Sequence, residues 1–381
     1  MKPKIKIALL TDKMDVRPER TAFPREFVEN LIKHSEFEVT LVHYKHMSDA
    51  PIYIKVREII LPKNRLPWGS HFISYMKFCL TTKEKFDIFM IFVPRPYPFY
   101  WFFPAKRIVI KAHDGYVGLW TIPNMVFWFT LTFFNKFLHA VVGVSEFGSR
   151  EIIYTYHIPP EKIFTIYNPL ESVYKPASKE EIKKAFEKYN ITTEKYFLHS
   201  GSLNRHKNVI RVVKAYMHLR KENPDIEEKL IFIGGNAADK IKEILHATGL
   251  EQSPYYADVI FNGNVLTEYR PAFYTSATAL VKISFKEGFG MSIAEAMACG
   301  SPVIASNISA LPEAVGGAGI LVNPYDVKEI AEAMKKTATD EKLRKELSKK
   351  GFERVKGFTW QNCIDQYINL FKKILYENSN R

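Results

Sequence analysis

Short apolar runs alternate along the chain with longer stretches in which apolar residues recur every three or four positions. The short runs are rich in β-branched and aromatic side chains and are therefore predicted to be strands. The longer stretches, such as residues 27–34, have the period of a helix with one buried face. Nearly continuous apolar strands that alternate with helices are typical of parallel sheets covered on both faces. In the first half of the chain the predicted strands are residues 5–10, 38–44, 86–92, 108–112 and 140–144.

The alternation stops near residues 168–178, where Pro169 and Pro176 interrupt it, and then begins again. A second set of strands is predicted at residues 196–199, 229–233, 259–261, 279–283, 303–305 and 319–322. The sequence therefore predicts two α/β domains in tandem, residues 1–172 and 173–358. An amphipathic helix is predicted near the end of the chain, from residue 359 to residue 376.

A glycine-rich turn follows the predicted strand of residues 279–283. The sequence reads KEGFG over residues 286–290, and a helix is predicted from about residue 291 to residue 299. Glycines allow a close approach of the backbone to a ligand, and the free N–H groups at a helix start suit a phosphate. Glu287 and Glu295 lie eight positions apart, which leaves about 80° between them on a helix. The segment thus predicts a phosphate-binding turn flanked by two carboxylates.

The excess of basic over acidic residues indicates which kinds of partner the protein attracts. The 381 residues include 54 Lys and Arg against 41 Asp and Glu, a formal net charge of +13. Such an excess attracts polyanions, which include nucleic acid, anionic membranes and phosphorylated small molecules. The sequence has no helix-turn-helix signature, zinc finger or clustered basic helix, so no nucleic-acid partner is expected. No G-x-G-x-x-G follows an early strand in either half, which argues against a nicotinamide dehydrogenase.

The charge and the rings are concentrated in the first 170 residues, which carry +8 of the net charge and 31 of the 53 aromatic residues. The runs YPFYWFF (97–103) and MVFWFTLTFFNKF (125–137) place rings beside Lys and Arg. This composition suits a membrane interface, and a ring-rich core helix remains the alternative. Three widely spaced cysteines without zinc-ligand spacing indicate reduced thiols. We expect a cytoplasmic protein, with peripheral contact to the inner face of the cell membrane left open.

The stretch EGFGMSIAEAMACGSPVIAS (287–306) closely resembles the E-x7-E signature of retaining family 4 glycosyltransferases. The resemblance implies the GT-B fold, which is two Rossmann-like doubly wound domains facing a cleft, with the C-terminal helix (359–381) crossing back to the first domain. It implies transfer of a hexose from a UDP- or GDP-linked sugar to an acceptor, which in this family is often lipid-linked. Further segments that match the family are YFLHSGSLNRHKN (196–208), FNGNV (261–265), KAHD (111–114) and FTW (358–360).

The same resemblance implies roles for individual residues. Lys207 aligns with the lysine that binds the donor diphosphate, and Arg205 is the candidate for its basic partner. Glu287 would accept hydrogen bonds from the donor sugar and Glu295 from the ribose, and His113 would reach the donor across the cleft. The other residues implied in donor binding, the last two of them near the base, are Gly201, Gly288, Phe289, Gly290, Met291, Ser292, Asn262 and Val265.

No D-x-D motif occurs in the sequence. Many other glycosyltransferases use such a pair to hold a divalent metal on the diphosphate. We therefore expect donor binding without a metal, and no cofactor beyond the nucleotide-sugar substrate. A sugar phosphorylase or a nucleotide-sugar epimerase of the same fold, and more distantly a basic nucleic-acid-binding protein, remain alternatives.

Overall fold

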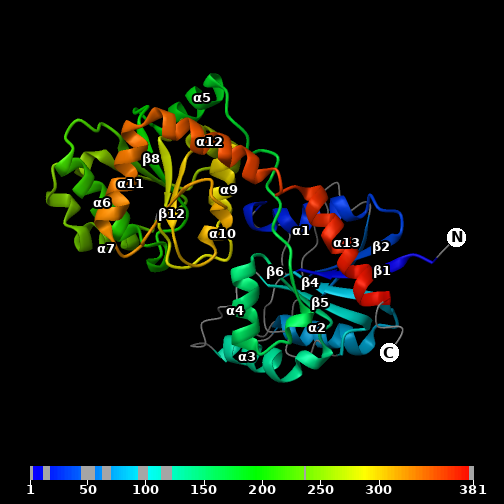
Figure 1. Cartoon of the computed structure of the whole chain (residues 1–381). Helices are drawn as coiled ribbons and strands as arrows, with labels where there is room; N and C mark the ends of the chain where they lie inside the picture. Colours follow the sequence, from blue (N-terminus) through cyan, green and yellow to red (C-terminus); the bar gives the residue numbers. More distant parts are fainter. Residues whose placement is uncertain are drawn as a thin grey trace. The chain divides into compact units, whose positions relative to one another are not determined.

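The computed structural model describes residues 3–11, 18–43, 56–61, 70–92, 102–112, 122–235 and 237–376. The chain divides into two compact units (Figure 1). The first unit consists of Met1–Pro169 together with Trp360–Arg381, and the second unit is Leu170–Thr359.

The described part of the first unit is built on a seven-stranded parallel sheet with the order β3-β2-β1-β4-β5-β6-β7. The central strands β1, β4 and β5 are formed by apolar runs that are buried on both faces of the sheet, as expected for parallel strands between helices. The strands are β1 (Ile5–Leu10), β2 (Phe37–His43), β3 (Arg57–Ile60), β4 (Phe86–Ile91), β5 (Ala105–Ala112), β6 (Ala140–Gly143) and β7 (Ile163–Thr165).

Helices cover both faces of this sheet, and they pack into two apolar clusters. Helices α1 and α13 cover one face (Figure 1), where the ring of Phe27 on α1 lies 4.9 Å from that of Tyr367 on α13. The last helix of the chain therefore completes the core of the first unit. The helices of this unit are α1 (Pro18–Leu31), α2 (Ser70–Thr81), α3 (Ile122–Phe134), α4 (Glu146–Tyr156) and α13 (Trp360–Tyr376).

The second unit has a six-stranded parallel sheet with the order β10-β9-β8-β11-β12-β13. The chain runs outward from β8 to β10 and then returns to the other side of β8 as β11. The order of strands therefore changes direction between β8 and β11, which is where doubly wound sheets bind ligands. The strands are β8 (Tyr196–Ser200), β9 (Lys229–Ile233), β10 (Val259–Gly263), β11 (Ala279–Lys282), β12 (Val303–Ser306) and β13 (Ile320–Val322).

Most strands of the second unit are followed by a helix, and apolar side chains on α6, α7 and α11 form one cluster with the sheet. The prediction of two Rossmann-like α/β domains is thus confirmed. Within the part of the chain that the structure describes, no helix has the length and apolarity needed to span a bilayer. The helices are α5 (Lys179–Tyr189), α6 (Val209–Glu222), α7 (Ala238–Thr248), α8 (Arg270–Ser276), α9 (Met291–Ala298), α10 (Leu311–Val315), α11 (Val327–Thr339) and α12 (Glu341–Val355).

Candidate active site

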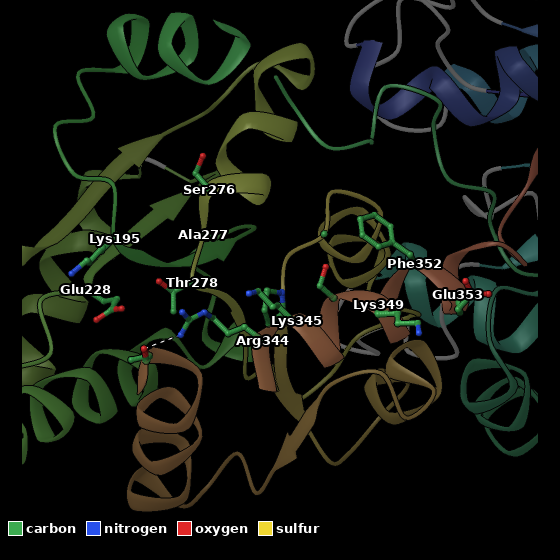
Figure 2. Close-up of a pocket in the computed structure, with 14 residues that line it drawn as sticks. Lys195, Glu228, Ser276, Ala277, Thr278, Arg344, Lys345, Lys349, Phe352 and Glu353 are labelled. Carbon is green, nitrogen blue, oxygen red and sulfur yellow. Dashed lines mark hydrogen bonds between the residues drawn. The ribbon is translucent and has the colours of Figure 1, made fainter. Parts of the chain in front are cut away.

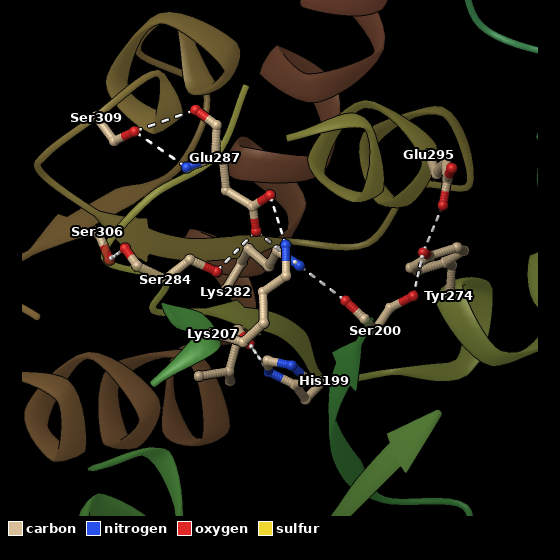
Figure 3. A network of polar contacts seen from close by, with 11 residues as sticks. His199, Ser200, Lys207, Tyr274, Lys282, Ser284, Glu287, Glu295, Ser306 and Ser309 are labelled. Carbon is tan, nitrogen blue, oxygen red and sulfur yellow. Dashed lines mark hydrogen bonds and ion pairs between the residues drawn. The ribbon is translucent and has the colours of Figure 1, made fainter. Parts of the chain in front are cut away.

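Polar side chains meet at the carboxyl ends of β8 and β11, where the strand order of the second unit changes direction. Glu287 follows β11, and its carboxylate lies between two lysines (Figure 3). Its Oε2 atom lies 2.7 Å from Lys207 Nζ, and its Oε1 atom lies 3.1 Å from Lys282 Nζ. The Ser284 hydroxyl donates to Oε1 at 2.8 Å. Lys207 comes from the short 3-10 helix η5 (Arg205–Lys207) after β8, so the ion cluster joins both strand ends.

The electrostatics of this cluster keep Glu287 ionised. Burial alone would raise the pKa of its carboxyl group, because only 12% of the side chain is exposed. The nearby ammonium groups of Lys282 and Lys207 outweigh burial, and hydrogen bonds from Lys207 and Ser284 add to their effect, so the pKa falls to about 2. Glu287 is therefore a carboxylate, able to accept hydrogen bonds, throughout the ordinary pH range.

Glu295, on α9, belongs to the same polar network but has different surroundings. The Tyr274 hydroxyl lies 2.6 Å from Glu295 Oε2 and 2.8 Å from Ser200 Oγ. Because a phenol carries one proton, it can donate to the carboxylate while it accepts from the serine. Burial raises the pKa of Glu295 despite the hydrogen bond from Tyr274. The Ser200 carbonyl in turn accepts from Lys282 at 2.9 Å, so Ser200 and Lys282 connect the two glutamates (Figure 3).

Two glycines shape the backbone around these side chains. Gly201 follows β8 with a φ of +137°, and a Cβ atom there would lie 3.0 Å from Lys282 Nζ. Gly290 precedes α9 with a φ of +102°, and a Cβ atom there would lie 2.8 Å from Leu311 Cδ2. Both positions therefore require glycine. They leave room beside the lysines and at the start of α9, whose first residues are Met291 and Ser292.

Glu287 is also held through its backbone. Its N–H donates to Ser309 Oγ at 3.1 Å, and the Ser309 hydroxyl lies 3.1 Å from its carbonyl oxygen. The predicted turn residue Phe289 is 3% exposed and packs edge-on against Phe358, with ring centroids 5.2 Å apart. Its side chain thus anchors the turn in the core and leaves only the backbone for ligand binding.

Three of the residues singled out from the sequence lie away from this cluster. Arg205 is 84% exposed and pairs with Glu243 on α7, with 2.9 Å between Nε and Oε1. Asn262 donates to the Tyr189 carbonyl at 2.8 Å, and Val265 is 1% exposed. The structure brings together Lys207, Glu287 and, through Ser200, Glu295, but it turns Arg205 away from them. His113 lies outside the described residues.

Comparison with known proteins supplies the family. The family model for glycosyl transferases group 1 matches residues 181–354, and that for Glycosyltransferase Family 4 matches residues 24–174. The O-antigen chain mannosyltransferase B of Escherichia coli is 31% identical over 276 residues, which cover 70% of this chain and 70% of that protein. This chain belongs to the group 1, family 4 glycosyltransferases. It is an enzyme with glycosyltransferase activity, and it has the GT-B fold.

Solved structures show how widely this fold is shared. The glycosyltransferase resembles one from Rickettsia africae with a TM-score of 0.77 at 17% identity, over 98% of this chain and 99% of that one. It resembles HepE from Anabaena, solved with UDP and glucose, with a TM-score of 0.75 at 17% identity, over 97% of this chain and all of that one. At such identities the likeness supports the fold alone.

A groove of about 770 Å³ lies elsewhere in the second unit of this glycosyltransferase (Figure 2). It is lined by Lys195, Thr278 and Pro302, which precede β8, β11 and β12, and by residues of α12 such as Arg344 and Lys349. The groove therefore lies at the amino ends of the strands, at the opposite edge of the sheet from Glu287. It is separate from the candidate active site of the glycosyltransferase.

Five residues of the glycosyltransferase site were not predicted from the sequence: Lys282, Ser200, Ser284, Ser309 and Tyr274. One signal for Lys282 was available, because it is the single charged residue in the apolar run of residues 279–283. Nothing in the sequence assigned a role to the three serines or to the tyrosine. Among the described residues, no group of three or more His, Cys, Asp or Glu side chains is arranged to hold a metal ion.

Proposed function

We propose that this glycosyltransferase moves a hexose from a UDP- or GDP-linked sugar to an acceptor, with retention of the anomeric configuration and without a divalent metal. The observation that carries the proposal is the cluster of Lys207, Glu287 and Lys282. It lies at the switch point of the second sheet, which is the place between β8 and β11 where the strand order changes direction. It combines cations for a diphosphate with a fixed carboxylate for sugar hydroxyls, next to a helix start.

The residues of the cluster and of α9 would have different roles in the reaction. Cleavage of the glycosyl–phosphate bond leaves negative charge on the diphosphate, and preorganised cations and N–H groups stabilise such charge. Lys207 and the first turn of α9 would provide this stabilisation. The Glu287 carboxylate would accept hydrogen bonds from the sugar, and Glu295 from the ribose. In the retaining mechanism that we propose, the leaving phosphate removes the proton from the acceptor hydroxyl on the same face of the sugar.

The relatives suggest which donors to test first. The E. coli relative that is 31% identical is named a mannosyltransferase, which favours a mannosyl donor. HepE, which shares the fold, was solved with UDP and glucose. GDP-mannose and UDP-glucose are therefore the first two candidates, with other UDP- and GDP-hexoses after them.

A donor screen by thermal stabilisation tests the proposal. A ligand that binds the native protein at 100 times its Kd adds about 2.7 kcal/mol of stability. We expect one nucleotide series, either UDP or GDP, to raise the melting temperature equally with EDTA and with added Mg²⁺ or Mn²⁺. The same donor should transfer its sugar to a membrane extract in EDTA. Binding of neither nucleotide would refute the proposed donor site, and activity that requires the metal would refute metal independence.

We also propose that the first unit binds a membrane surface, where a lipid-linked acceptor would be found. The support is a stripe of exposed apolar side chains along α3 and the short 3-10 helix η3 (Asn135–Phe137) that follows it. Phe129 is 50% exposed and Phe133 60% exposed, and their ring centroids lie 4.8 Å apart. Lys136 lies beside the stripe, with Nζ 5.2 Å from the Phe137 ring centroid. The exposed stripe consists of Met125, Val126, Phe129, Phe133 and Phe137.

Flotation with anionic liposomes tests the membrane proposal. We expect the wild type to float with vesicles of phosphatidylglycerol and phosphatidylcholine at low salt, because exposed rings and adjacent cations suit a lipid interface. The double variant F129S/F133S should float at least several-fold less while it melts at the wild-type temperature. Y154S is the matched control, because Tyr154 is 79% exposed but lies on α4. Failure of the wild type to float would refute the proposal.

A further inference from the structure

Lys282 is the buried cation of this cluster, and the roles assigned above to Lys207, Glu287 and Glu295 leave its own contribution undefined. It is the last residue of β11, and 3% of its side chain is exposed. An ammonium group removed from water destabilises the fold by several kcal/mol unless its protons find acceptors. Burial lowers its pKa, and the charge of Glu287 acts in the opposite direction. A buried titratable group at the ligand-binding edge of a doubly wound sheet is a candidate for function.

The contacts of Lys282 connect the two strand ends at the switch point. Its Nζ atom donates to the Ser200 carbonyl, at the end of β8, and contacts Glu287, after β11 (Figure 3). Two of its three N–H groups therefore have acceptors among the described residues. The 3.0 Å approach of a Cβ atom at Gly201 shows that the glycine leaves space beside the ammonium. A ligand in that space would meet a cation that is already oriented.

The charges of the cluster show what Lys282 contributes beside Lys207. Lys207 and Lys282 carry two positive charges and Glu287 one negative charge, so the cluster has one net positive charge. Burial and the neighbouring lysines lower the pKa of His199 to about 3, and the same causes lower that of His206, so neither ring adds charge at pH 7. The titratable groups around Lys282 are His199 on β8, His206 and Lys207 in η5, Glu287 after β11, and Glu295 on α9. Glu295 is left out of the net charge, because its charge is opposed by that of Arg270.

We propose that Lys282 is a positioning residue of the donor site, whose ammonium orients the Glu287 carboxylate and leaves the cluster one net positive charge for the nucleotide diphosphate. The proposal rests on the proposed function, because it assigns the diphosphate to this site. Without Lys282, Lys207 and Glu287 neutralise one another, and the diphosphate meets a pair with no net charge. Lys282 thus allows the site to keep a carboxylate for the sugar without losing its attraction for the phosphates.

The net charge of the cluster predicts how four forms of the protein rank in their affinity for the diphosphate nucleotide. No acceptor is needed for this measurement. K282M should bind the diphosphate nucleotide about tenfold more weakly than the wild type, because the local net charge falls from +1 to zero. E287Q should bind at least as tightly as the wild type. The double variant K282M/E287Q has a net charge of +1 again and should return to within a few-fold of the wild type.

The experiment is calorimetric titration of the full chain with UDP and with GDP at pH 7.5 and 0.15 M salt. Melting curves recorded beside it confirm that each variant is folded. K195M is the matched control, because it removes one positive charge from the same unit, where Lys195 is 64% exposed and pairs with Glu227. We expect its affinity to equal that of the wild type.

Three results would overturn the inference, and each has a distinct meaning. If the wild type binds neither UDP nor GDP, the proposed function fails as well. If the wild type binds but K282M binds equally tightly, only the assignment of Lys282 fails. If K282M binds weakly and the double variant binds as weakly or more weakly, the lysine acts by holding the fold, since a purely structural loss is not rescued by removal of a second charge.

Discussion

The surroundings of Glu287 and Glu295 shift the pKa values of the two carboxyl groups in opposite directions. Two ammonium groups lower the pKa of Glu287 to about 2, whereas burial beside a phenol raises that of Glu295. Pairs of carboxyl groups whose pKa values are pushed apart are typical of sites that use them differently. Glu287 can only accept hydrogen bonds in the physiological pH range, whereas the Glu295 carboxyl group holds a proton more readily than an exposed glutamate does.

Substitution of the ion cluster should affect catalysis far more than folding. We expect E287Q and K207M each to lower kcat/KM about a hundredfold, which is about 2.7 kcal/mol of transition-state stabilisation. Steady-state transfer with the donor found in the screen measures this loss. E353Q is a suitable control, because Glu353 is 63% exposed on α12. Near-wild-type rates in both E287Q and K207M would show that the reaction takes place elsewhere.

Only those parts of the site that depend on short stretches of the chain could be predicted from the sequence. The turn at residues 286–290 and the two glutamates follow from spacing, whereas the contact between Glu287 and Lys207 is seen only in the structure. The sequence does not show where the Arg205 side chain points, because its partner Glu243 lies 38 positions away along the chain. Lys282 was missed because a strand pattern gives no reason to look for a functional cation inside an apolar run.

At the scale of elements, the start of α9 depends on how closely it approaches α10. Gly290 adopts a φ of +102° at the N-cap of α9, and no side chain caps this helix end. Leu311, the first residue of α10, lies where a side chain at Gly290 would point. The turn therefore brings α9 and α10 together, and a side chain would move one of them.

We expect G290A to destabilise the protein by about 1–3 kcal/mol, through backbone strain and the contact with Leu311. G317A separates the two causes, because Gly317 also has a positive φ, +80°, but a Cβ atom there meets nothing within 4 Å. G317A should therefore cost about 1 kcal/mol or less. Denaturant unfolding measures both changes. Equal losses in the two variants would show that the contact with Leu311 does not matter.

The elements that the sequence predicted best are those with the strongest apolar pattern. Strands such as β1 and β4 were predicted within a residue because most of their positions are apolar and buried. The edge strands β3 and β7 were missed, since they have only four and three residues and are partly exposed. The aromatic run of α3 was left undecided, because rings occur on both its buried and its exposed sides and only the packing of the helix separates them.

At the scale of the whole molecule, the two units differ in how the chain builds them. The second unit is one continuous segment, whereas the first is made of two segments separated by 190 positions. Helix α13 covers one face of the first sheet with seven buried side chains, and the Arg107 guanidinium on β5 donates to the Ile374 carbonyl near the end of α13. The last segment is thus part of the first unit in both its apolar and its polar contacts.

A chain that stops at Thr359 should have a stable second unit and an unstable first unit. Each fully buried apolar side chain contributes about 1.5–3 kcal/mol, so the loss of α13 is comparable to the whole net stability of a domain. We expect limited proteolysis to digest the first unit and to leave a fragment close to residues 170–359. The full-length protein with I374A, which shortens a single buried side chain of α13, is the control. Protection of the first unit in the shortened chain would contradict this prediction.

The discontinuous first unit also sets the order in which the protein can be made. Its sheet emerges from the ribosome first, but one face is not fully covered until the last helix is translated, which at 5–20 residues per second takes roughly 10–40 s longer. During this interval that face of the nascent sheet is covered by α1 alone and lacks the apolar side chains of α13, while the second unit can already fold. The segment that begins the chain is therefore the last to finish folding, and it is the part for which a chaperone would matter most.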